Sequence, residues 1–519
     1  MENSLSRRNF IGGALMAGAG LAGAAALAGC SGNGAVKKDT TGIKWDKEAD
    51  VVIVGAGAAG LWAAVKAYDN ALSAVVLEKE PEASAGGDVR CCGGYLLPVA
   101  TDPGVMMSTG SFGEANEDLV YDVDSYGMEA IDWLIDHKYM AWADTPYVVV
   151  DGAGPGIYEG LLAAAKDCDA EILYETPGRS LITNDDGEVV GVVAGSEEAP
   201  INVKASYGVL LATGAYTMNE ELMRNFHLMG MDYYSVGAPS LTGDGLIMAG
   251  ELGAKLSKLP KGYEIMYLVS KAASKAVGTG VFCVPPATNS VVIVNQNGDR
   301  FINEYESFTH NKGSLPLFDF EGEMSQCRAD GAHFVNSRMF EIVDQATFDA
   351  GTLGNVNGGC SWANLMPAEV GGYLWSQDNQ AELANGWIMK GDTLADIAAA
   401  IEVSPEHLQQ TIDRYNEECA AGTDDFGRSP DKKQPIGSGP YYAIELAPSI
   451  IYTIGGLTTD ECGRTLSWRN ELIPRLYSAG NIGQVITYLQ PIGVNGCWGQ
   501  AAVAVDNMAE LEPWDRDLA

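Results

Sequence analysis

The sequence predicts an α/β fold in which one mostly parallel sheet takes strands from both ends of the chain, with an α+β domain inserted between them. Three observations lead to this expectation. A strand, a glycine turn and a helix follow one another near residue 50, and a glycine turn with an apolar helix returns at residues 493–508. Between about residues 286 and 440 the chain has less glycine and more amphipathic helix. We therefore expect this segment to form a separate domain.

The first strand, turn and helix lie within residues 47–78. Val51–Val54 is a β-branched run long enough for a buried strand, and an alanine-rich helix follows the turn. The turn carries a GxGxxG pattern formed by Gly55, Gly57 and Gly60. Such glycines allow a tight turn, close approach of a pyrophosphate and close packing of helix on strand. Because the next strand ends on Glu78, whose carboxylate can accept hydrogen bonds from ribose, the unit predicts a site for an ADP-containing dinucleotide; a coincidental glycine turn is the alternative.

A second glycine-rich loop follows at residues 85–94, where the backbone could lie against a phosphate or a flat ring system. Its adjacent thiols, Cys91 and Cys92, are interpreted as inert fillers, with a redox role as the alternative. The next expected elements are helices at 114–138 and 156–167, short strands of an antiparallel insertion at 170–174, 178–183 and 189–193, a buried strand at 207–211, and a helix at 246–252. Asp244 would cap that last helix or reach a cofactor.

The inserted segment opens with strands expected at 290–294 and 300–304, joined by a turn at 295–299. Amphipathic helices are expected at 393–401 and 405–419. The chain then returns to the first domain through a strand and loop at 451–459, a strand and turn at 476–481, and the final glycine-to-helix unit.

The first 30 residues predict an export signal and are excluded from the fold. The pair Arg7-Arg8 precedes a run of Gly, Ala, Leu and Met at residues 11–29, as in twin-arginine signals. The run closes on Leu27-Ala28-Gly29-Cys30, which resembles a lipobox and makes Cys30 the expected lipidated residue; plain cleavage at this place is the alternative. Residues 31–45 would be a tether, and the mature protein would be extracytoplasmic and attached to the membrane through its lipid only.

Composition excludes several classes of partner. Asp and Glu number 69 against 32 Lys and Arg, giving a net charge of −37, which argues against binding to nucleic acid or to anionic lipid by charge. The ten cysteines form neither CxxC nor CxxCH, so we expect no covalent haem and find no readable spacing for a metal or iron–sulfur site.

Six motifs in one order resemble a flavoprotein family that includes soluble fumarate reductase, urocanate reductase and 3-ketosteroid dehydrogenase. They are the GxGxxG turn with Glu78, the loop at 86–94, the strand end at 212–215, TGDG at 242, GDRFINE at 298 and YSAGNIG at 477. The resemblance covers nearly all of residues 46–519. It implies a Rossmann-like split domain, 46–285 plus 441–519, that binds FAD, and a substrate held between the isoalloxazine ring and a cap domain at 286–440.

The resemblance also assigns residues to the cofactor. The expected FAD-binding residues are Gly55, Ala56, Gly57, Ala58, Ala59, Gly60, Glu78, Lys79, Gly86, Gly87, Asp88, Cys92, Gly93, Gly94, Thr213, Gly214, Asp244, Gly480, Asn481 and Gly496. In the family, the residue at Glu78 takes the adenosine ribose and the residue at Asn481 approaches the ribityl chain.

Departures from the family pattern narrow the substrate. Fumarate and urocanate reductases carry an arginine shortly after the glutamate of RFxNE, whereas Tyr305, Glu306, Ser307 and Phe308 follow Glu304 here. The later arginine site reads 344–348 without a basic residue, and Tyr452 replaces the histidine before TxGG. A polycarboxylate substrate is therefore not expected. Tyr488, with Gly496 eight residues later, resembles the ketosteroid dehydrogenase ending, although Ile492 stands where that pattern has glycine.

The expected catalytic residues are Tyr488 and Glu304. Hydride transfer from flavin N5 to a conjugated alkene requires a hydrogen-bond donor at the adjacent carbonyl, and a neutral tyrosine can provide it. Glu304 would relay a proton or, as an equal alternative, hold a cap strand by hydrogen bonding. Further candidates for proton delivery, which the sequence does not rank, are Tyr233, Tyr234, Tyr263 and Tyr267.

Together these features predict an FAD-dependent oxidoreductase that reduces a carbonyl-conjugated C=C bond in an apolar, aromatic or steroid-like small molecule. Because the chain has no haem motif and no second GxGxxG unit for NAD(P)H, its electrons would come from an external donor such as a quinol-linked carrier or a cytochrome. A 3-ketosteroid Δ1-dehydrogenase is the first alternative, and a flavin electron carrier without substrate chemistry is the second.

Overall fold

The computed structural model of the chain describes residues 42–96, 117–145, 149–226, 233–257, 268–284, 286–307, 336, 338–354, 361–453, 455–483 and 493–515. Residues 40–513 form one compact unit, and the terminal residues form another, of which only 514 and 515 are described. The expected signal and Cys30 lie outside the described residues. In the part of the chain that the structure describes, no helix has both the length and the apolar character needed to cross a membrane.

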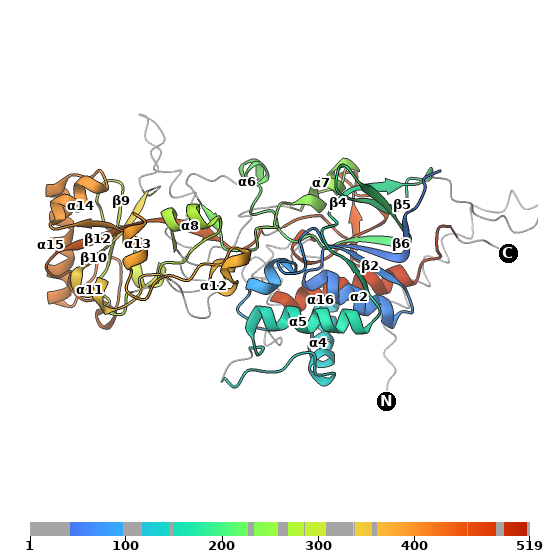
Figure 1. Ribbon diagram of the computed structural model, residues 1–519, viewed down its shortest axis with the longest axis horizontal. Helices are drawn as coiled ribbons and strands as arrows, with labels where there is room; N and C mark the ends of the chain where they lie inside the picture. The colour runs from blue at the N-terminus through green and yellow to red at the C-terminus, as the bar shows by residue number, and fades with distance from the viewer. Residues whose placement is uncertain are drawn as a thin grey trace, which may run out of the picture. The chain divides into compact units, whose positions relative to one another are not determined.

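Within the described residues the first sheet has eight strands, and it is built around β1 (Lys47–Val54). Its path runs β13-β14-β6-β1-β2-β3, and every pair from β14 to β3 is parallel. The other strands on this path are β2 (Ala74–Leu77), β3 (Glu171–Leu173), β6 (Pro200–Leu211), β13 (Arg464–Leu466) and β14 (Leu472–Ser478). The sheet therefore joins strands from the two ends of the chain, as the sequence predicts (Figure 1).

The parallel strands end at the same edge of this sheet. Val54 pairs with both Leu77 and Leu211, and Leu211 pairs with Ser478. Parallel neighbours need a crossover, and the helices that supply the crossovers cover the sheet. The loops that follow Val54, Leu77, Leu211 and Ser478 consequently meet at one place.

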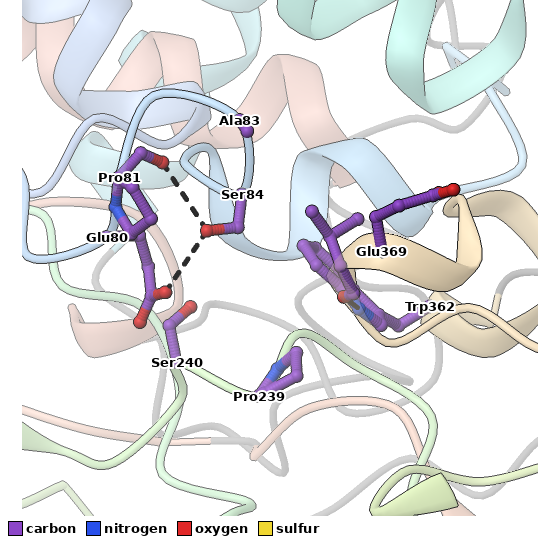
Figure 2. Close-up of a pocket in the computed structure, with 9 residues that line it drawn as sticks. Glu80, Pro81, Ala83, Ser84, Pro239, Ser240, Trp362 and Glu369 are labelled. Carbon is purple, nitrogen blue, oxygen red and sulfur yellow. Dashed lines mark hydrogen bonds between the residues drawn. The ribbon is translucent and has the colours of Figure 1, made fainter.

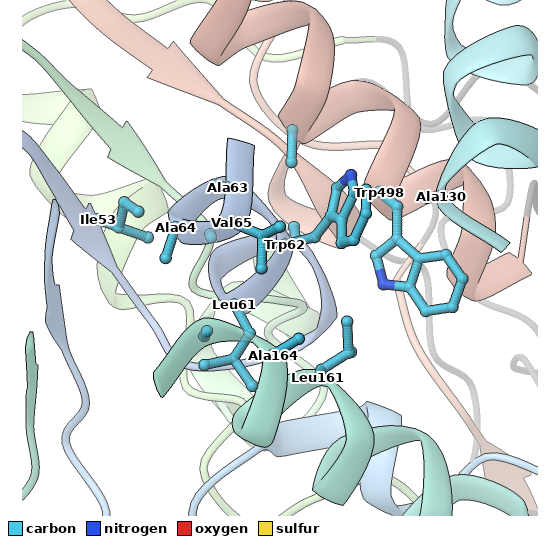
Figure 3. Close-up of a cluster of buried hydrophobic side chains, with 14 of the residues drawn as sticks. Ile53, Leu61, Trp62, Ala63, Ala64, Val65, Ala130, Leu161, Ala164 and Trp498 are labelled. Carbon is cyan, nitrogen blue, oxygen red and sulfur yellow. The ribbon is translucent and has the colours of Figure 1, made fainter. Parts of the chain in front are cut away.

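One face of the first sheet is covered by helices (Figure 1). These are α2 (Ala58–Asp69), α4 (Glu117–Asp136), α5 (Ala153–Asp167) and α16 (Gly493–Ala509). Trp62 and Trp498 lie in the core between them, with ring centroids 6.2 Å apart (Figure 3). A Cβ at Gly499 would lie 1.9 Å from the carbonyl oxygen of Val123, so the glycine- and alanine-rich sequence of α16 lets it pack directly on the backbone of α4.

The opposite face carries a β-hairpin and a short helix. The hairpin is β4 (Gly178–Thr183) and β5 (Val189–Gly195), which continues antiparallel into β6, and the helix is α7 (Asp244–Glu251). The expectation that residues 170–174 belong to this antiparallel insertion is wrong, because β3 pairs in parallel with β2. β3 directly follows α5, and a strand that follows a crossover helix returns parallel to its neighbour.

A second sheet, of six strands in the part of the chain that is described, has β12 (Tyr441–Ile450) at its centre. The other strands are β7 (Tyr234–Ser235), β8 (Leu268–Ser270), β9 (Val292–Asn295), β10 (Met339–Asp344) and β11 (Met389–Gly391). β12 pairs with four of these, β7, β8, β10 and β11. The strand expected at 451–459 therefore lies earlier, at 441–450. The second sheet also begins before and ends after residues 286–440, and the proposed domain boundaries stay a prediction.

Helices α14 (Leu394–Ala400) and α15 (Pro405–Ala421) pack on one face of the second sheet through a core that includes Phe340 and Ile342. Their starts match the sequence signals: Thr393 and Asp396 form a capping box, and the Ser404 side chain accepts from His407 N. The remaining described helices are α6 (Glu220–Phe226), α8 (Lys271–Val277), α9 (Glu304–Ser307), α11 (Gln345–Ala350), α12 (Trp362–Leu365) and α13 (Gln380–Ala384).

The strand expected at 300–304 is not formed. Arg300 makes one isolated bridge to Val294, and the helix α9 begins at Glu304. The reason is an ion pair between Arg300 and Glu304, four residues apart, with Nε to Oε1 at 2.7 Å, which draws the segment into a turn instead of an extended strand.

Candidate cofactor site

The GxGxxG turn has the geometry that each of its glycines predicts. Gly55 has φ +108°, and a Cβ there would lie 2.5 Å from the carbonyl oxygen of Ala212. A Cβ at Gly60 would lie 1.8 Å from the Gly55 carbonyl oxygen, so the helix α2 sits against its own strand. At Gly57 the space is open: among the described residues only the Gly86 oxygen comes within 4 Å, at 3.5 Å. No side chain caps α2, so its first N–H groups are available to an anion.

Glu78 is a buried acid that holds the turn in place. Its Oε2 accepts from Ala56 N and its Oε1 from Glu80 N, each at 2.9 Å. Burial raises the pKa of Glu78, while the two backbone hydrogen bonds act in the opposite direction. A carboxylate has about four acceptor positions, so two remain for ribose hydroxyls. The expected role of Glu78 is compatible with these contacts and stays a prediction.

Lys79 and Asp244, both expected at the cofactor, contact each other. Lys79 Nζ lies 2.8 Å from Asp244 Oδ2 and 2.5 Å from Thr242 Oγ1. Asp244 does not cap α7 through its side chain, because it is the first helical residue and Gly243 occupies the N-cap position. This cluster joins the loop after β2 to the start of α7.

The second glycine loop contains a short 3₁₀ turn, η2 (Gly87–Cys91). Gly86 precedes it with φ +113°, where a Cβ would meet the Tyr158 ring at 2.7 Å, and a Cβ at Gly94 would lie 2.6 Å from Ala153 Cα. The loop therefore lies directly on α5, and Gly154 N donates to the Cys92 carbonyl oxygen at 3.1 Å. Cys91 is buried and Cys92 is half-buried, and neither forms a disulfide bond with a described residue. Their expected inert role stays a prediction.

The C-terminal part of the chain comes to the same edge. Ala479 N donates to the Leu211 carbonyl oxygen at 3.0 Å, and Ala212 N donates to that of Val54 at 2.9 Å. At Gly480 a Cβ would lie 3.2 Å from Ala59 Cβ, so Asn481, the next residue, lies beside the start of α2. Thr213 and Gly214 follow β6 at this edge, Gly93 follows η2 in the second loop, and Gly496 lies in the first turn of α16.

A cavity of about 380 Å³ adjoins the second glycine loop (Figure 2). Its described lining residues are Glu80, Pro81, Ala83, Ser84, Pro239, Ser240, Trp362, Glu369 and Val370. Ser84 Oγ lies 3.3 Å from Glu80 Oε2 and 3.4 Å from the Pro81 carbonyl oxygen (Figure 2). None of these lining residues is lysine or arginine, so the described wall offers no cation to a carboxylate.

Comparison with known families decides what this site binds. The model of the FAD binding domain family matches residues 50–142 and 111–495, which is most of the chain. The chain belongs to this family. It is therefore a flavoprotein with FAD as its cofactor and an FAD-dependent oxidoreductase.

Individual relatives of this FAD-binding protein are distant. Digoxin reductase of Eggerthella lenta is 24% identical, and the alignment covers 99% of this chain and 99% of the relative. The fumarate reductase (cytochrome) of Shewanella frigidimarina is 25% identical over 83% of this chain and 72% of its own length. Among solved structures, 3-ketosteroid Δ1-dehydrogenase from Sterolibacterium denitrificans has TM-score 0.69 and 19% identity, covering 89% of this chain and 100% of its own. The last likeness establishes a shared fold.

The residues present fit FAD. The uncapped start of α2 and the open space at Gly57 suit a pyrophosphate, and Glu78 keeps acceptor positions for ribose. Thr213 Oγ1 and Asp88 Oδ2 are buried and have no hydrogen-bond partner within the described ranges. Because buried polar atoms without partners are costly, both atoms are suited to contact a bound group.

Glu304 lies elsewhere, in a buried ion network of the second sheet. Arg300 holds both of its carboxylate oxygens, at 2.7 and 2.8 Å, and Arg428 Nη1 lies 3.3 Å from Oε2. Burial lowers the pKa of Arg300, but its hydrogen bonds to Glu304 and Asp424 outweigh that effect and raise it. These contacts are of the kind expected if Glu304 has a structural role, which is the alternative to proton relay. Its catalytic role stays a prediction.

The tyrosines expected to take part in catalysis are described only in part. Tyr488, Tyr263 and Tyr267 lie outside the described residues. Tyr233 is half-buried, and burial raises its pKa to about 12. Gln500 belongs to no motif found in the sequence: its Oε1 accepts from Gly480 N at 2.8 Å and fixes the turn before Asn481. Only the packing of α16 brings it there.

Gly57→Ala is expected to weaken FAD binding at least tenfold, or about 1.4 kcal/mol, because the new methyl group enters the space through which the pyrophosphate approaches. The melting temperature of the cofactor-free protein should not fall, since no described atom obstructs that methyl group. The matched control is Gly250→Ala, in an exposed and open position on α7. Equal FAD affinity in both variants, measured by flavin fluorescence, would contradict the placement of the pyrophosphate.

Glu304→Gln is expected to lower the free energy of unfolding by about 3 kcal/mol, because it leaves buried Arg300 and Arg428 without their shared carboxylate. Turnover per bound FAD should change less than tenfold. Glu417→Gln, which removes an exposed glutamate from α15, is the control for denaturant unfolding and activity assays. A loss of turnover above a hundredfold with unchanged unfolding would instead assign Glu304 to proton transfer.

Proposed function

We propose that this flavoprotein reduces a carbonyl-conjugated C=C bond in an apolar or aromatic small molecule, with electrons from a separate donor. The named substrates of several relatives contain such a bond or an equivalent one, including digoxin, urocanate and vinyl phenol. The observation that carries the choice of an uncharged substrate is the absence of the two arginines that fumarate and urocanate reductases carry: Tyr305, Glu306, Ser307 and Phe308 follow Glu304, and residues 344–348 contain no basic residue. A dicarboxylate such as fumarate would therefore lack the cations that bind carboxylates.

Bound FAD would supply a hydride from N5 of its isoalloxazine ring. The protein must then stabilise negative charge on the carbonyl oxygen of the substrate and provide a proton for the neighbouring carbon. We assign the first task to Tyr488, whose hydroxyl is neutral at pH 7 because a tyrosine ordinarily has a pKa of about 10. The backbone N–H groups at the start of α16, near Gly496, would offer further donors.

A 3-ketosteroid Δ1-dehydrogenase is the second candidate. Tyr488 and Gly496 have the spacing of the ketosteroid dehydrogenase ending, and a relative of 26% identity over 66% of this chain is a 3-oxosteroid 1-dehydrogenase. The same residues could serve either direction, because one donor to a carbonyl oxygen stabilises the same enolate in oxidation and in reduction.

We also propose that the protein is exported by the twin-arginine route and held at the membrane by a lipid on Cys30, where a quinol-linked carrier or a cytochrome reduces it. Arg7-Arg8 and the Leu27 to Cys30 sequence support this proposal. Cys30→Ala should release the protein from washed membranes in a fractionation assay. Retention of that variant in the membrane fraction would argue against the lipid anchor.

The reaction is tested by reducing the bound FAD without oxygen and adding candidate substrates in a stopped-flow spectrometer. Enones should reoxidise it rapidly, and fumarate should not. Bleaching of the oxidised protein by a saturated 3-ketosteroid would favour the dehydrogenase, and no response to either class would favour an electron carrier.

The same assay tests Tyr488. Tyr488→Phe should retain FAD and lose at least a hundredfold in the rate of reoxidation by an enone, since one donor to a developing oxyanion contributes about 2.7–4 kcal/mol. Tyr68→Phe, at an exposed position on α2, is the control. Unchanged reoxidation in Tyr488→Phe would remove this tyrosine from the mechanism.

A further inference from the structure

Asp88 is a buried acid in the second glycine loop, expected at the cofactor, whose ability to exchange a proton has not yet been given a role. It is the second residue of η2, and a Cβ at Gly57 would lie 3.5 Å from the carbonyl oxygen of Gly86, two residues before it. The loop that carries Asp88 therefore lies beside the start of α2, where the family binds its cofactor. Asp88 Oδ1 accepts from Ala238 N at 3.0 Å, on the segment that leads into the cavity of Figure 2.

The other oxygen of this carboxyl group has no hydrogen-bond partner in the described part of the chain. Asp88 Oδ2 is buried and makes no hydrogen bond to any described residue. An unpaired buried polar atom costs about 1–3 kcal/mol, and more when it is charged. A surface position would avoid this cost, so an acid held here requires a use for its free oxygen.

The charged and titratable groups that face Asp88 do not neutralise it. Its own turn contributes the Cys91 thiol, whose Sγ lies 3.7 Å from Oδ1, and α16 contributes Cys497. From α5, Tyr158 packs against the loop, but it holds Arg90 over its ring at 5.1 Å. The segment around Ala238 and the helix α12 contribute no charged side chain to it among the described residues.

Burial raises the pKa of Asp88 to about 7, because none of these neighbours is a cation that would favour the ionised form. Burial and the charge of Asp88 together raise the pKa of Cys497 to about 12. Near neutral pH the thiol therefore stays neutral, and Asp88 is the group of this cluster that changes its charge.

We propose that Asp88 is the redox-linked proton acceptor of the cofactor site. Above about pH 7 it is ionised while the site is oxidised, binds one proton for every two electrons that enter, and releases that proton when the electrons leave. The reason is electrostatic: reduction adds negative charge to a site from which water is largely excluded, and a nearby carboxylate then gains affinity for a proton.

The electrons and protons taken up in this step are those that reduction of a C=C bond requires. Two electrons come from the external donor, one proton accompanies them to the ring, and Asp88 takes a second proton from solvent. These two electrons and two protons equal the two hydrogen atoms that saturate a C=C bond. The inference depends on FAD binding and not on the substrate, so it can fail while the proposed function holds, and the reverse is also true.

The test is an anaerobic spectroelectrochemical titration of the FAD-loaded protein between pH 5.5 and 9, with no substrate. For a two-electron couple each proton taken up contributes about 30 mV per pH unit, which is a tenfold change in equilibrium constant. The wild-type slope should steepen by this amount above about pH 7, where Asp88 is ionised before reduction. Asp88→Asn should lose the steep segment, and Asp185→Asn, at an exposed turn, should keep it. Equal slopes in Asp88→Asn and wild type would overturn the proposal.

A second measurement uses only the wild-type chain. It therefore tests the proposal even if the Asp88→Asn variant fails to fold or to bind FAD. Infrared difference spectra are recorded on reduction at pH 8, in unlabelled protein and in protein with carboxyl-¹³C aspartate. A carboxylic acid C=O band that appears on reduction and shifts with the label supports protonation of an aspartate. Absence of such a band overturns the proposal, whatever the variant does.

Discussion

The meeting of three parallel strands at one edge is the constraint on which the site depends. β1 and β6 end together because Val54 pairs with Leu211, and β14 ends with them because Leu211 pairs with Ser478. Backbone hydrogen bonds fix this register, and a one-residue shift would turn the side chains of a strand to the opposite face. Residues more than 400 positions apart, Gly55 and Asn481, are brought to the same loop cluster by two strand pairings and not by any contact between their side chains.

Three buried acids show how surroundings give one functional group different tasks. Glu304 has two arginines around it, so its charge is compensated and its place is fixed. Glu78 receives two backbone N–H groups and serves the turn that carries the glycines. Asp88 receives one backbone N–H group and a weak thiol contact, and no described residue donates to its other oxygen. With few compensating donors around it, burial raises the pKa of Asp88 to about 7.

Much of the first sheet could be predicted because its signals are local. The β-branched run before Gly55 and the spacing of the glycines specify strand, turn and helix within a few residues. The pairing of β3 could not be predicted, because its sequence suits either direction and the crossover through α5 decides it. Residues 300–304 follow a turn and are expected to form a strand, yet Glu304 pairs with Arg300 and with the distant Arg428 and begins a helix. Gln500 beside Gly480 depends on helix packing, which no local pattern encodes.

The position of β12 affects how this protein could be recombined with its relatives. This strand pairs with β10 and β11 on one stretch and with β7 and β8 on another, so elements from residue 234 to residue 450 share one hydrogen-bonded sheet. A chimera that exchanged only residues 286–440 would cut this sheet on both sides of its central strand. A chimera intended to transfer substrate specificity between family members would keep the strand pairings of this sheet intact only if both of its junctions lay outside residues 234–450.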